Sequence, residues 1–554
     1  MKRLLFLLFL LFSPAIAFDC STSLVGVMER AEGVYDGLIA NLTVFTRPGS
    51  GRVWVDTMPL TKVETQVSAR LAKEVSCELL GFDCSTFDFF YVIRSDFPLV
   101  GGPSAGAPMA ICTLASLLNL TIDPLVAMTG TINPDGSVGP VGAIDSKASV
   151  LGDFNLFIVP EGSFFNSSVV DSVEVSSITD AFGYYTGYKF IESNVSSASV
   201  VNGDYTYLMS LMSSNLISDA TYDLNGSLAS SFLNVSRDFF DNSSFYSSAS
   251  YAVQSLIYSF FESNTFLLND SSLVSSFIDG VSSDIDSFRD SLFSGVVINH
   301  LYDLEGLAVT FDRVSEASSL VVDARSFLND SLSDALFSAC FAKVRLITAV
   351  EWSNVIDYFS DSRTIDFDVN HIKPLVLSRL ELARDSIAYS KVIVDPSLLF
   401  SAEEHLDNAI SAYLSGDYFY SLFESLKARA EANLLMEVRG FTNVSGRISF
   451  KRESALRSVS DSMSKGYVPL LSLSFLEYSK AFSEEPYQEL VFLSYAKEFS
   501  SLGYSLNEYF NYAPAVGVSS YELVRFDYSS FVSTVFIFIV GFVLGLVAVL
   551  AFFP

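Results

Sequence analysis

The chain has 554 residues, half of them hydrophobic and 14% aromatic, so it is long enough for two or three folded domains. Its 33 basic and 63 acidic residues give a net charge of −30. A chain this acidic repels phosphate backbones, which argues against nucleic-acid binding, and it disfavours broad docking on an anionic membrane surface.

The first residues have the pattern of a secretory signal peptide. Lys2 and Arg3 precede an apolar stretch at 4–12, and Ala15-Ile16-Ala17 forms a small-x-small cleavage site. An uncleaved anchor is the alternative, but the apolar stretch is short for a membrane span. The sequence therefore predicts a signal peptide at 1–17.

Residues 18–200 predict a domain of mixed α and β structure. Apolar runs alternate with Gly- and Pro-containing breaks, as is typical of strands and helices joined by turns. In chain order we expect a hairpin of strands at 44–45 and 53–55 around the turn 47–51, a helix over 63–80 ended by Gly81, a strand at 89–93, a helix from 107 to about 118, a strand at 126–132 turned by Asn133-Pro134-Asp135-Gly136, and a strand at 154–159 closed by Pro160.

Residues 201–512 predict an all-helical domain, because long stretches lack Gly and Pro and apolar residues recur at helical spacing. The clearest helix begins with a capping-box pattern at 401–404. Leu406, Ile410 and Leu414 form its apolar stripe.

A second helix at 418–438 follows the turn 415–417 and is stopped by Gly440. The pair resembles one tetratricopeptide-type unit, although the chain has no repeat of fixed period. A stalk at 513–530 then leads to an uncharged apolar run at 531–553, long enough to span a bilayer as a single helix.

Several features agree with an ectodomain outside the cytoplasm, attached to the cell membrane by that single pass. Gly541 and Gly545 form a G-x-x-x-G pattern that lets two membrane helices approach, so a homo-oligomer is one expectation. Ten N-x-S/T sequons fit a glycoprotein: Asn41, Asn119, Asn166, Asn194, Asn225, Asn234, Asn242, Asn269, Asn329 and Asn443.

The five cysteines carry a weaker signal about the compartment. A Cys77–Cys84 bridge can form in an oxidising environment, and the odd count leaves at least one thiol unpaired. Cys112, on the helix predicted after residue 107, reads as a small core residue. The cysteine and histidine spacings match no zinc motif, and no metal or organic cofactor is implied.

The sharpest local feature is the stretch Gly101-Gly102-Pro103-Ser104-Ala105-Gly106, directly before a predicted helix. A serine there lies exposed on a tight turn, with neighbouring backbone N–H groups available to bind an oxyanion. Because serine is a poor nucleophile until a base takes its proton, the nature of the base decides the mechanism.

Lysine is the best candidate base in this domain. Lys62 and Lys73 belong to the segment around a predicted surface helix, whereas Lys147 follows the predicted hairpin in an apolar neighbourhood. Burial favours a neutral amine, which a lysine base requires. All the histidines lie beyond residue 200 and read as surface or packing residues: His300, His371 and His405.

These residues resemble the proteolytic domain of Lon proteases. The matching stretch includes GPSAG at 102–106, VAMTG at 126–130, the glycine-rich run at 136–142, and Lys147, which lies 43 positions after Ser104. A weaker likeness extends back to about residue 22, so the resemblance covers roughly a quarter of the chain. A membrane-anchored protein of this kind looks similar to archaeal members.

The resemblance implies roles for individual residues. Ser104 is the nucleophile and Lys147 the general base, while Thr129 hydrogen-bonds and orients the lysine. Backbone groups around Gly102, Pro103 and Ala105 help to hold the oxyanion. The implied fold is an α+β Lon-type proteolytic domain, followed here by an all-α ectodomain and a C-terminal transmembrane helix.

The chain also departs from the family pattern. Gly101 stands where many relatives carry an acidic residue, and Ala143 replaces a common glycine. No G-x-x-x-x-G-K-[ST] loop occurs in these 554 residues, so the implied activity is ATP-independent cleavage of exposed or unfolded polypeptide.

Other interpretations remain open at this stage. GPSAG also fits the nucleophile elbow of an α/β-hydrolase, and the S-x-x-K at 462–465 matches penicillin-binding enzymes without their companion motifs. A non-catalytic surface glycoprotein that binds partners or peptides through its helical domain is the main alternative. A protein that cuts its own chain once is another.

Overall fold

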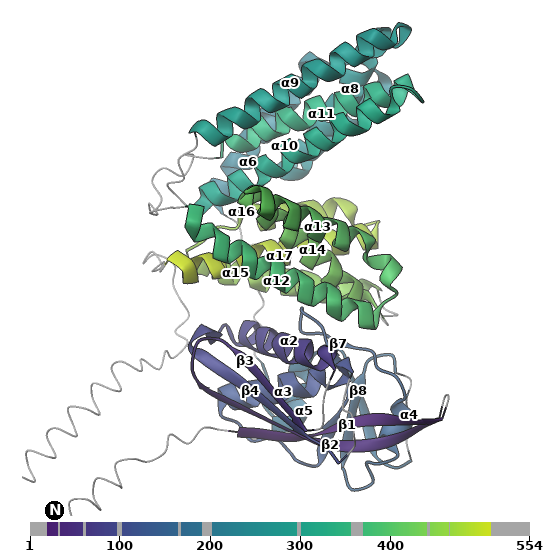
Figure 1. Cartoon of the computed structure of the whole chain (residues 1–554), viewed down its shortest axis with the longest axis vertical. Coiled ribbons are helices and arrows are strands. Elements are labelled where there is room, and N and C mark those ends of the chain that lie inside the picture. The colour runs from purple at the N-terminus through teal and green to yellow at the C-terminus, as the bar shows by residue number, and fades with distance from the viewer. Residues whose placement is uncertain are drawn as a thin grey trace, which may run out of the picture. The chain divides into compact units, whose positions relative to one another are not determined.

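The computed structural model describes residues 19–510, except 32–33, 59–61, 97–101, 164, 166–167, 191–201, 296–300, 356–368, 440–443 and 465. An α/β region comes first and an all-helical region follows it, as the sequence predicts (Figure 1). The boundary predicted at 200/201 falls outside the described residues and stays a prediction.

The α/β region is built on a mixed seven-stranded sheet in the order β3-β4-β2-β1-β5-β8-β9, with a separate two-stranded hairpin of β6 and β7. β1, β2 and β4 pair antiparallel, whereas β5, β8 and β9 continue parallel to β1. The strands are β1 (Asp19–Ala31), β2 (Val34–Pro48), β3 (Val53–Met58), β4 (Phe87–Arg94), β5 (Val126–Met128), β6 (Thr131–Ile132), β7 (Val138–Gly139), β8 (Leu156–Pro160) and β9 (Asp171–Val175).

Three helices pack on one face of this sheet and bury its main core (Figure 1). They are α2 (Val63–Leu80), α3 (Gly106–Leu118) and α5 (Ile178–Thr186). A fourth, short helix α4 (Ile144–Ala148) belongs to a smaller cluster that includes Val25, Ala127 and Phe157. The candidate base Lys147 therefore lies on a helix that is packed against the strands.

Several predicted elements are confirmed. The helix expected at 63–80 has those bounds, and Gly81 ends it in the left-handed conformation with φ 58°, where glycine has no Cβ penalty. The expected strand at 89–93 lies within β4, the helix near 107–118 is α3, and the turn at 133–136 joins β6 to β7.

The hairpin expected around residues 47–51 is wrong. β2 and β3 do not pair, because β4 lies between them, antiparallel to β2 and parallel to β3. The carboxylate of Asp88 on β4 accepts hydrogen bonds from the backbone N–H groups of Ser50 and Arg52, at 2.8 and 3.0 Å. The turn is therefore held against β4 instead of closing a ladder between its own flanking strands.

The strand expected at 126–132 is divided in two. β5 ends at Met128 and β6 begins at Thr131, so Thr129 and Gly130 leave the sheet between them. Their backbone groups bond to the segment around Ser104 and to β8 instead. β1, β9 and α5 are elements that the sequence did not predict individually.

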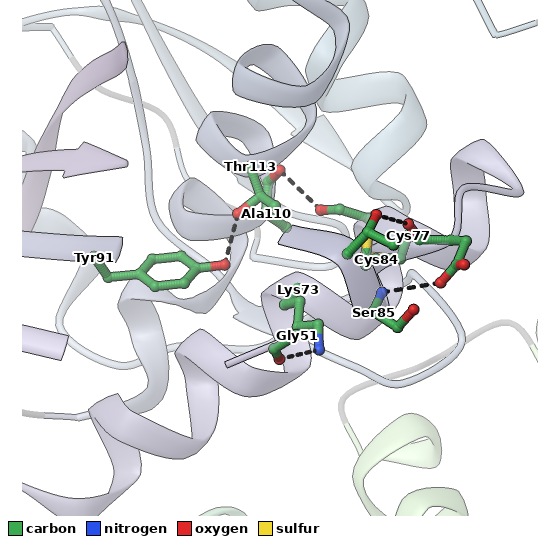
Figure 2. The surroundings of a disulfide bond; sticks show 11 residues. Gly51, Lys73, Cys77, Cys84, Ser85, Tyr91, Ala110 and Thr113 are labelled. Atoms are coloured by element: carbon green, nitrogen blue, oxygen red, sulfur yellow. Dashed lines mark hydrogen bonds between the residues drawn. A yellow bond between two sulfur atoms is a disulfide. The ribbon is translucent and has the colours of Figure 1, made fainter. Parts of the chain in front are cut away.

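Two disulfides cross-link the α/β region, one from α3 to β1 and one from α2 to the short 3-10 helix Cys84–Thr86 directly before β4. Cys77 at the end of α2 pairs with Cys84, the bridge left open by the sequence (Figure 2). Cys112 is fully buried but is not simply a small core residue, because it pairs with Cys20 on β1. That pairing spans 92 positions, so local spacing carries no signal of it. Cys340 is a buried free thiol.

The helical region consists of long helices around shared apolar cores. Its α-helices are α6 (Gly203–Tyr222), α7 (Ser227–Asp241), α8 (Phe245–Asn264), α9 (Ser271–Gly295), α10 (Leu301–Phe327), α11 (Leu332–Ser353), α12 (Val369–Ile393), α13 (Phe400–Ser415), α14 (Tyr418–Val438), α15 (Val444–Ser464), α16 (Leu470–Tyr478) and α17 (Pro486–Phe510).

The predicted helix pair is α13 and α14, with two corrections. The capping box at 401–404 is wrong, because α13 begins at Phe400, directly after the 3-10 helix η5 (Pro396–Leu399) that Asp395 caps. Leu406 and Ile410 pack against the core, but Leu414 is 80% exposed because it lies in the last turn of α13, just before Gly416.

The predicted signal peptide (1–17), stalk (513–530) and transmembrane helix (531–553) lie outside the described residues and remain predictions. Within the part of the chain that the structure describes, no helix combines the length and apolarity that a bilayer span needs.

Candidate active site

Ser104 lies on a tight turn whose backbone requires glycine at its start. Gly102 has φ 110° and ψ 157°, a region that side chains rarely enter. The 3-10 helix η2 (Pro103–Ala105) follows it and leads directly into α3. The N–H groups of Ser104 and Ala105 belong to this first turn, where backbone donors have no acceptor within the helix. They are the donors expected to face an oxyanion.

The start of α3 is seated closely on the β6–β7 hairpin. A Cβ on Gly106 would lie 2.6 Å from Cγ2 of Ile132, so any larger residue would push this turn away from β6. Further along α3, the Ala110 carbonyl accepts from Ser76 Oγ at 3.2 Å. Tyr91 and Thr113 hydroxyls meet at 2.8 Å (Figure 2). The helix that carries the serine turn is therefore fixed to α2 and β4.

Thr129 and Gly130 connect this turn to the sheet. The Gly130 N–H donates to the Ser104 carbonyl at 3.1 Å, and the Gly130 carbonyl accepts from Ala107 N at 3.0 Å. Thr129 N donates to the Ile158 carbonyl on β8 at 3.1 Å. The split between β5 and β6 thus releases two residues that bond the serine turn on one side and β8 on the other.

Lys147 is 3% exposed, and its Nζ donates to Thr129 Oγ1 at 3.0 Å. Burial lowers the pKa of this amine from 10.5 to about 8, and no acidic group among the described residues acts against the shift. A group with that pKa is neutral in about one molecule in ten at pH 7, against fewer than about one in a thousand for an ordinary lysine. The local structure therefore prepares Lys147 to accept a proton.

The helix that carries Lys147 needs a small residue opposite it. A Cβ on Gly37 of β2 would collide with the Ser146 carbonyl, so glycine there lets α4 approach the strand. Ala143, immediately before α4, has φ 55°, which is unfavourable for a side chain. Although alanine replaces the expected glycine at this position, the backbone keeps the left-handed conformation that glycine favours.

The predicted site residues are thus partly brought together. Thr129 contacts Lys147 directly, and the neighbouring Gly130 contacts the backbone of Ser104, while Pro103 and Ala105 flank the serine in η2. Ser104 itself is half-buried. The pairing of Ser104 with Lys147 as a catalytic dyad stays a prediction. Gly101 lies outside the described residues.

Ser462 and His405, which the sequence analysis also considered, both have partners within the helical region. Ser462 is buried in α15 and donates to the Ser500 carbonyl at 2.6 Å, so the S-x-x-K match there reflects helix packing. Burial alone would lower the pKa of His405, but hydrogen bonds to Glu424 and Glu431 raise it to about 9. Within the described residues, no group of three or more His, Cys, Asp or Glu could hold a metal ion.

Sequence reasoning assigned no role to several residues that shape this site. Gly130 belongs to the VAMTG motif, but that motif carries no signal of its two backbone bonds, and no local pattern indicates the close approach at Gly37 and Gly106. Asp135 was seen only as a turn residue, although its carboxylate is fully buried. The N-P-D-G spacing predicts the turn but gives no signal of partners more than 300 positions away.

A serine on a tight pre-helix turn and a buried lysine held by a threonine are groups of the kind used by serine peptidases with a lysine base. The comparisons with known proteins relate this part of the chain to Lon proteases. It is 28% identical over 153 residues to the archaeal Lon protease of Thermoplasma acidophilum, covering 27% of this chain and 23% of the relative.

Two bacterial Lon proteases are also similar to this chain. The chain is 32% identical over 148 residues to the Lon protease of Paraburkholderia phytofirmans, covering 25% of this chain and 18% of the relative. It is 54% identical over 46 residues to Lon protease 1 of Bdellovibrio bacteriovorus, covering 8% and 6%. No family model matches. The chain is thus related to the Lon proteolytic domain, and it spans about a quarter or less of these relatives.

Proposed function

We propose that this protein is a serine endopeptidase in which Ser104 is the nucleophile and Lys147 the general base. The observation that carries the proposal is the state of Lys147, which is buried, bonded to Thr129 Oγ1 and shifted to a pKa of about 8. A structural lysine has no need of this arrangement, because burying an unpaired amine lowers stability. The relationship to Lon proteases supports the same assignment.

The reaction would proceed through an acyl-enzyme. Neutral Lys147 takes the proton of Ser104 Oγ as that oxygen attacks the carbonyl carbon of the scissile peptide bond. The backbone N–H groups of η2 stabilise the negative charge on the carbonyl oxygen. Lys147 then gives its proton to the leaving amine, the C–N bond breaks, and a water activated by Lys147 hydrolyses the ester.

The substrate would be unfolded or exposed polypeptide, cleaved without ATP. The 554 residues contain no P-loop motif that would supply a motor. The peptidase would face the outside of the cell membrane, anchored through residues 531–553, and act alone or as a homo-oligomer. Two disulfides in the α/β region support an oxidising compartment, where such bonds persist.

The test is hydrolysis of a fluorescently labelled unfolded protein by the full-length chain in detergent, without nucleotide. Ser104→Ala and Lys147→Ala serve as paired variants, with circular dichroism to check folding. Activity in the wild type alone is the expected result. Equal activity in all three samples would point to a contaminant, and an inert but folded wild type would favour a peptide-binding surface protein.

A further inference from the structure

The tip of the β6–β7 hairpin is held by buried charge. Asp135 is fully buried, and its Oδ1 accepts from the backbone N–H and the hydroxyl of Ser137, at 2.9 and 2.7 Å. Its other oxygen, Oδ2, pairs with the guanidinium of Arg447 on α15. One carboxylate therefore closes the turn of the hairpin and also joins it to the helical region.

The helical side of this contact is a buried network. Arg447 is 2% exposed, and Glu437 on α14 lies 3.5 Å from its guanidinium. Lys451, one turn further along α15, pairs with the same Glu437 at 2.5 Å. Lys497 on α17 donates to the Pro134 carbonyl at 2.8 Å. Helices α15 and α17 thus contact the turn at 133–136 directly, and Glu437 on α14 supports Arg447 from behind.

Burial alone would raise the pKa of Asp135, but Arg447, Lys451 and Lys497 lower it to about 2. The carboxylate is therefore ionised at every physiological pH, and the contact does not open by protonation. Buried ion pairs of this kind are costly to desolvate and add little net stability. In this protein the pair joins the turn at 133–136 to α15.

A second contact reaches the hairpin from α12. Tyr389 is completely buried in the same apolar core as Ile132 of β6. Burial raises the pKa of its hydroxyl, and the Ser68 hydroxyl and the Ile132 backbone act against that shift. Ile132 is the residue that faces Gly106 at the start of α3, two positions after Ser104. Contacts from the helical region therefore meet the hairpin both at its tip and at the strand beside the serine turn.

The ladder of the hairpin itself is short, although its backbone also bonds to Ser176 and Ile178 within the α/β region. Each of its strands has two residues, and a two-stranded ribbon of that size is marginal by itself in water. Yet it lies between Thr129-Gly130, which bond Lys147 and Ser104, and the segment that leads to Lys147. A displacement of the hairpin would therefore act on the segments that carry both Thr129-Gly130 and Lys147.

We propose that helices α12, α15 and α17 position the Ser104–Lys147 site by holding the β6–β7 hairpin in place, with Arg447 as the principal positioning residue and Glu437 on α14 supporting it. The expected effect on catalysis rests on the proposed function, whereas the contact between these helices and the hairpin does not. The helical region is then part of the catalytic unit, in addition to any partner it binds. A partner that displaced α15 would switch the site off without touching it.

The test uses the full-length chain and Arg447→Met, which keeps side-chain length and removes the charge. Asp135→Asn is the second variant, because an amide oxygen can still accept from Ser137 while the ion pair is lost. The matched control is Arg345→Met, which breaks the Arg345–Glu316 pair between α11 and α10, at 2.9 Å.

The first measurement is hydrogen–deuterium exchange of peptides that contain the Gly130 and Val138 amides. These donate to the Ser104 and Ser176 carbonyls in the wild type. Exchange in the hairpin should quicken by about tenfold or more in Arg447→Met and Asp135→Asn, and stay within about twofold in Arg345→Met. Unchanged hairpin exchange would overturn the proposal. So would faster exchange across α2 and α10 as well, because the network would then hold the whole fold.

The second measurement is the rate at which a fluorophosphonate labels Ser104, followed from pH 6 to 10. A positioning role predicts labelling about tenfold or more slower in both hairpin variants, with the inflection near pH 8 moved upward as water reaches Lys147. A variant that merely has a smaller fraction of folded molecules would label more slowly but keep the wild-type inflection, and that result would count against the proposal.

The two measurements test the proposed positioning role and the proposed function separately. If the wild type is not labelled but hairpin exchange is faster in the variants, the helices hold the hairpin and the proposed function is wrong. If the wild type is labelled normally but exchange is unchanged in the variants, the proposed function stands and the positioning role is wrong.

Discussion

Lys147 and Lys451 are the same residue type at nearly the same burial, 3% and 2% exposed, in the two regions of the molecule. Lys451 pairs with the Glu437 carboxylate inside a network of charges. Lys147 meets only a threonine hydroxyl among the described residues, and burial shifts its pKa to about 8. A buried cation with a carboxylate partner serves structure, whereas one left without such a partner is ready to give up its proton.

The largest expected effects come from replacing each lysine by methionine. Lys147→Met should lower hydrolysis by about a thousandfold or more, because it removes the base that the proposed mechanism assigns to Ser104. It should also raise the free energy of unfolding by about 2 kcal/mol. Relief of desolvation contributes about 3 kcal/mol, and the lost bond to Thr129 costs about 1.

Lys451→Met should do the opposite to stability. It leaves the Glu437 carboxylate buried with one partner fewer, which costs about 3–5 kcal/mol. Denaturant midpoints of the two variants and the wild type measure the contrast. Equal losses of stability in both variants would show that Lys147 is an ordinary structural cation, and the comparison would then fail.

A smaller effect is expected at the partner of Lys147. Thr129→Val keeps the shape of the side chain but removes the oxygen that accepts from Nζ. The amine loses its orientation, so kcat should fall by about ten- to a hundredfold with little change in KM. Thr129→Ser restores the hydroxyl and should recover most of the rate. A Val variant with wild-type kcat would remove Thr129 from the mechanism.

The pH dependence follows from the shift at Lys147. Because the base must be neutral, activity should rise with pH and level off above about pH 8. Stability should also rise between about pH 8 and 10.5, because the unfolded chain binds a proton there that the folded chain does not. Lys147→Met should lose that rise. A profile already flat above pH 6.5 would contradict the depressed pKa.

Sequence reasoning succeeded where the determinants are local. The bounds of α2 follow from its Gly- and Pro-free run and Gly81, and the place of Ser104 on a turn directly before a helix follows from its glycine-rich motif. It failed where distant segments meet. No local pattern shows that β4 lies between β2 and β3, or that Cys112 pairs with Cys20. For the same reason, no local pattern indicates the Asp135–Arg447 contact, whose partners are 312 positions apart.

The smallest expected effect concerns Ala143, where backbone strain lies next to the helix of Lys147. Its φ of 55° costs an alanine about 1–2 kcal/mol, while glycine there gives up about 0.5–1 kcal/mol of backbone entropy on folding. Ala143→Gly should therefore raise the free energy of unfolding by about 0.5–1 kcal/mol.

Ala148→Gly is the matched control for Ala143→Gly, because Ala148 lies within the same short helix α4, where glycine is unfavourable by about 1 kcal/mol. Opposite signs for the two substitutions would locate the strain at residue 143. If both substitutions destabilised the protein, the backbone before α4 would not be strained. The site would then owe the placement of Lys147 to packing against β2 through Gly37.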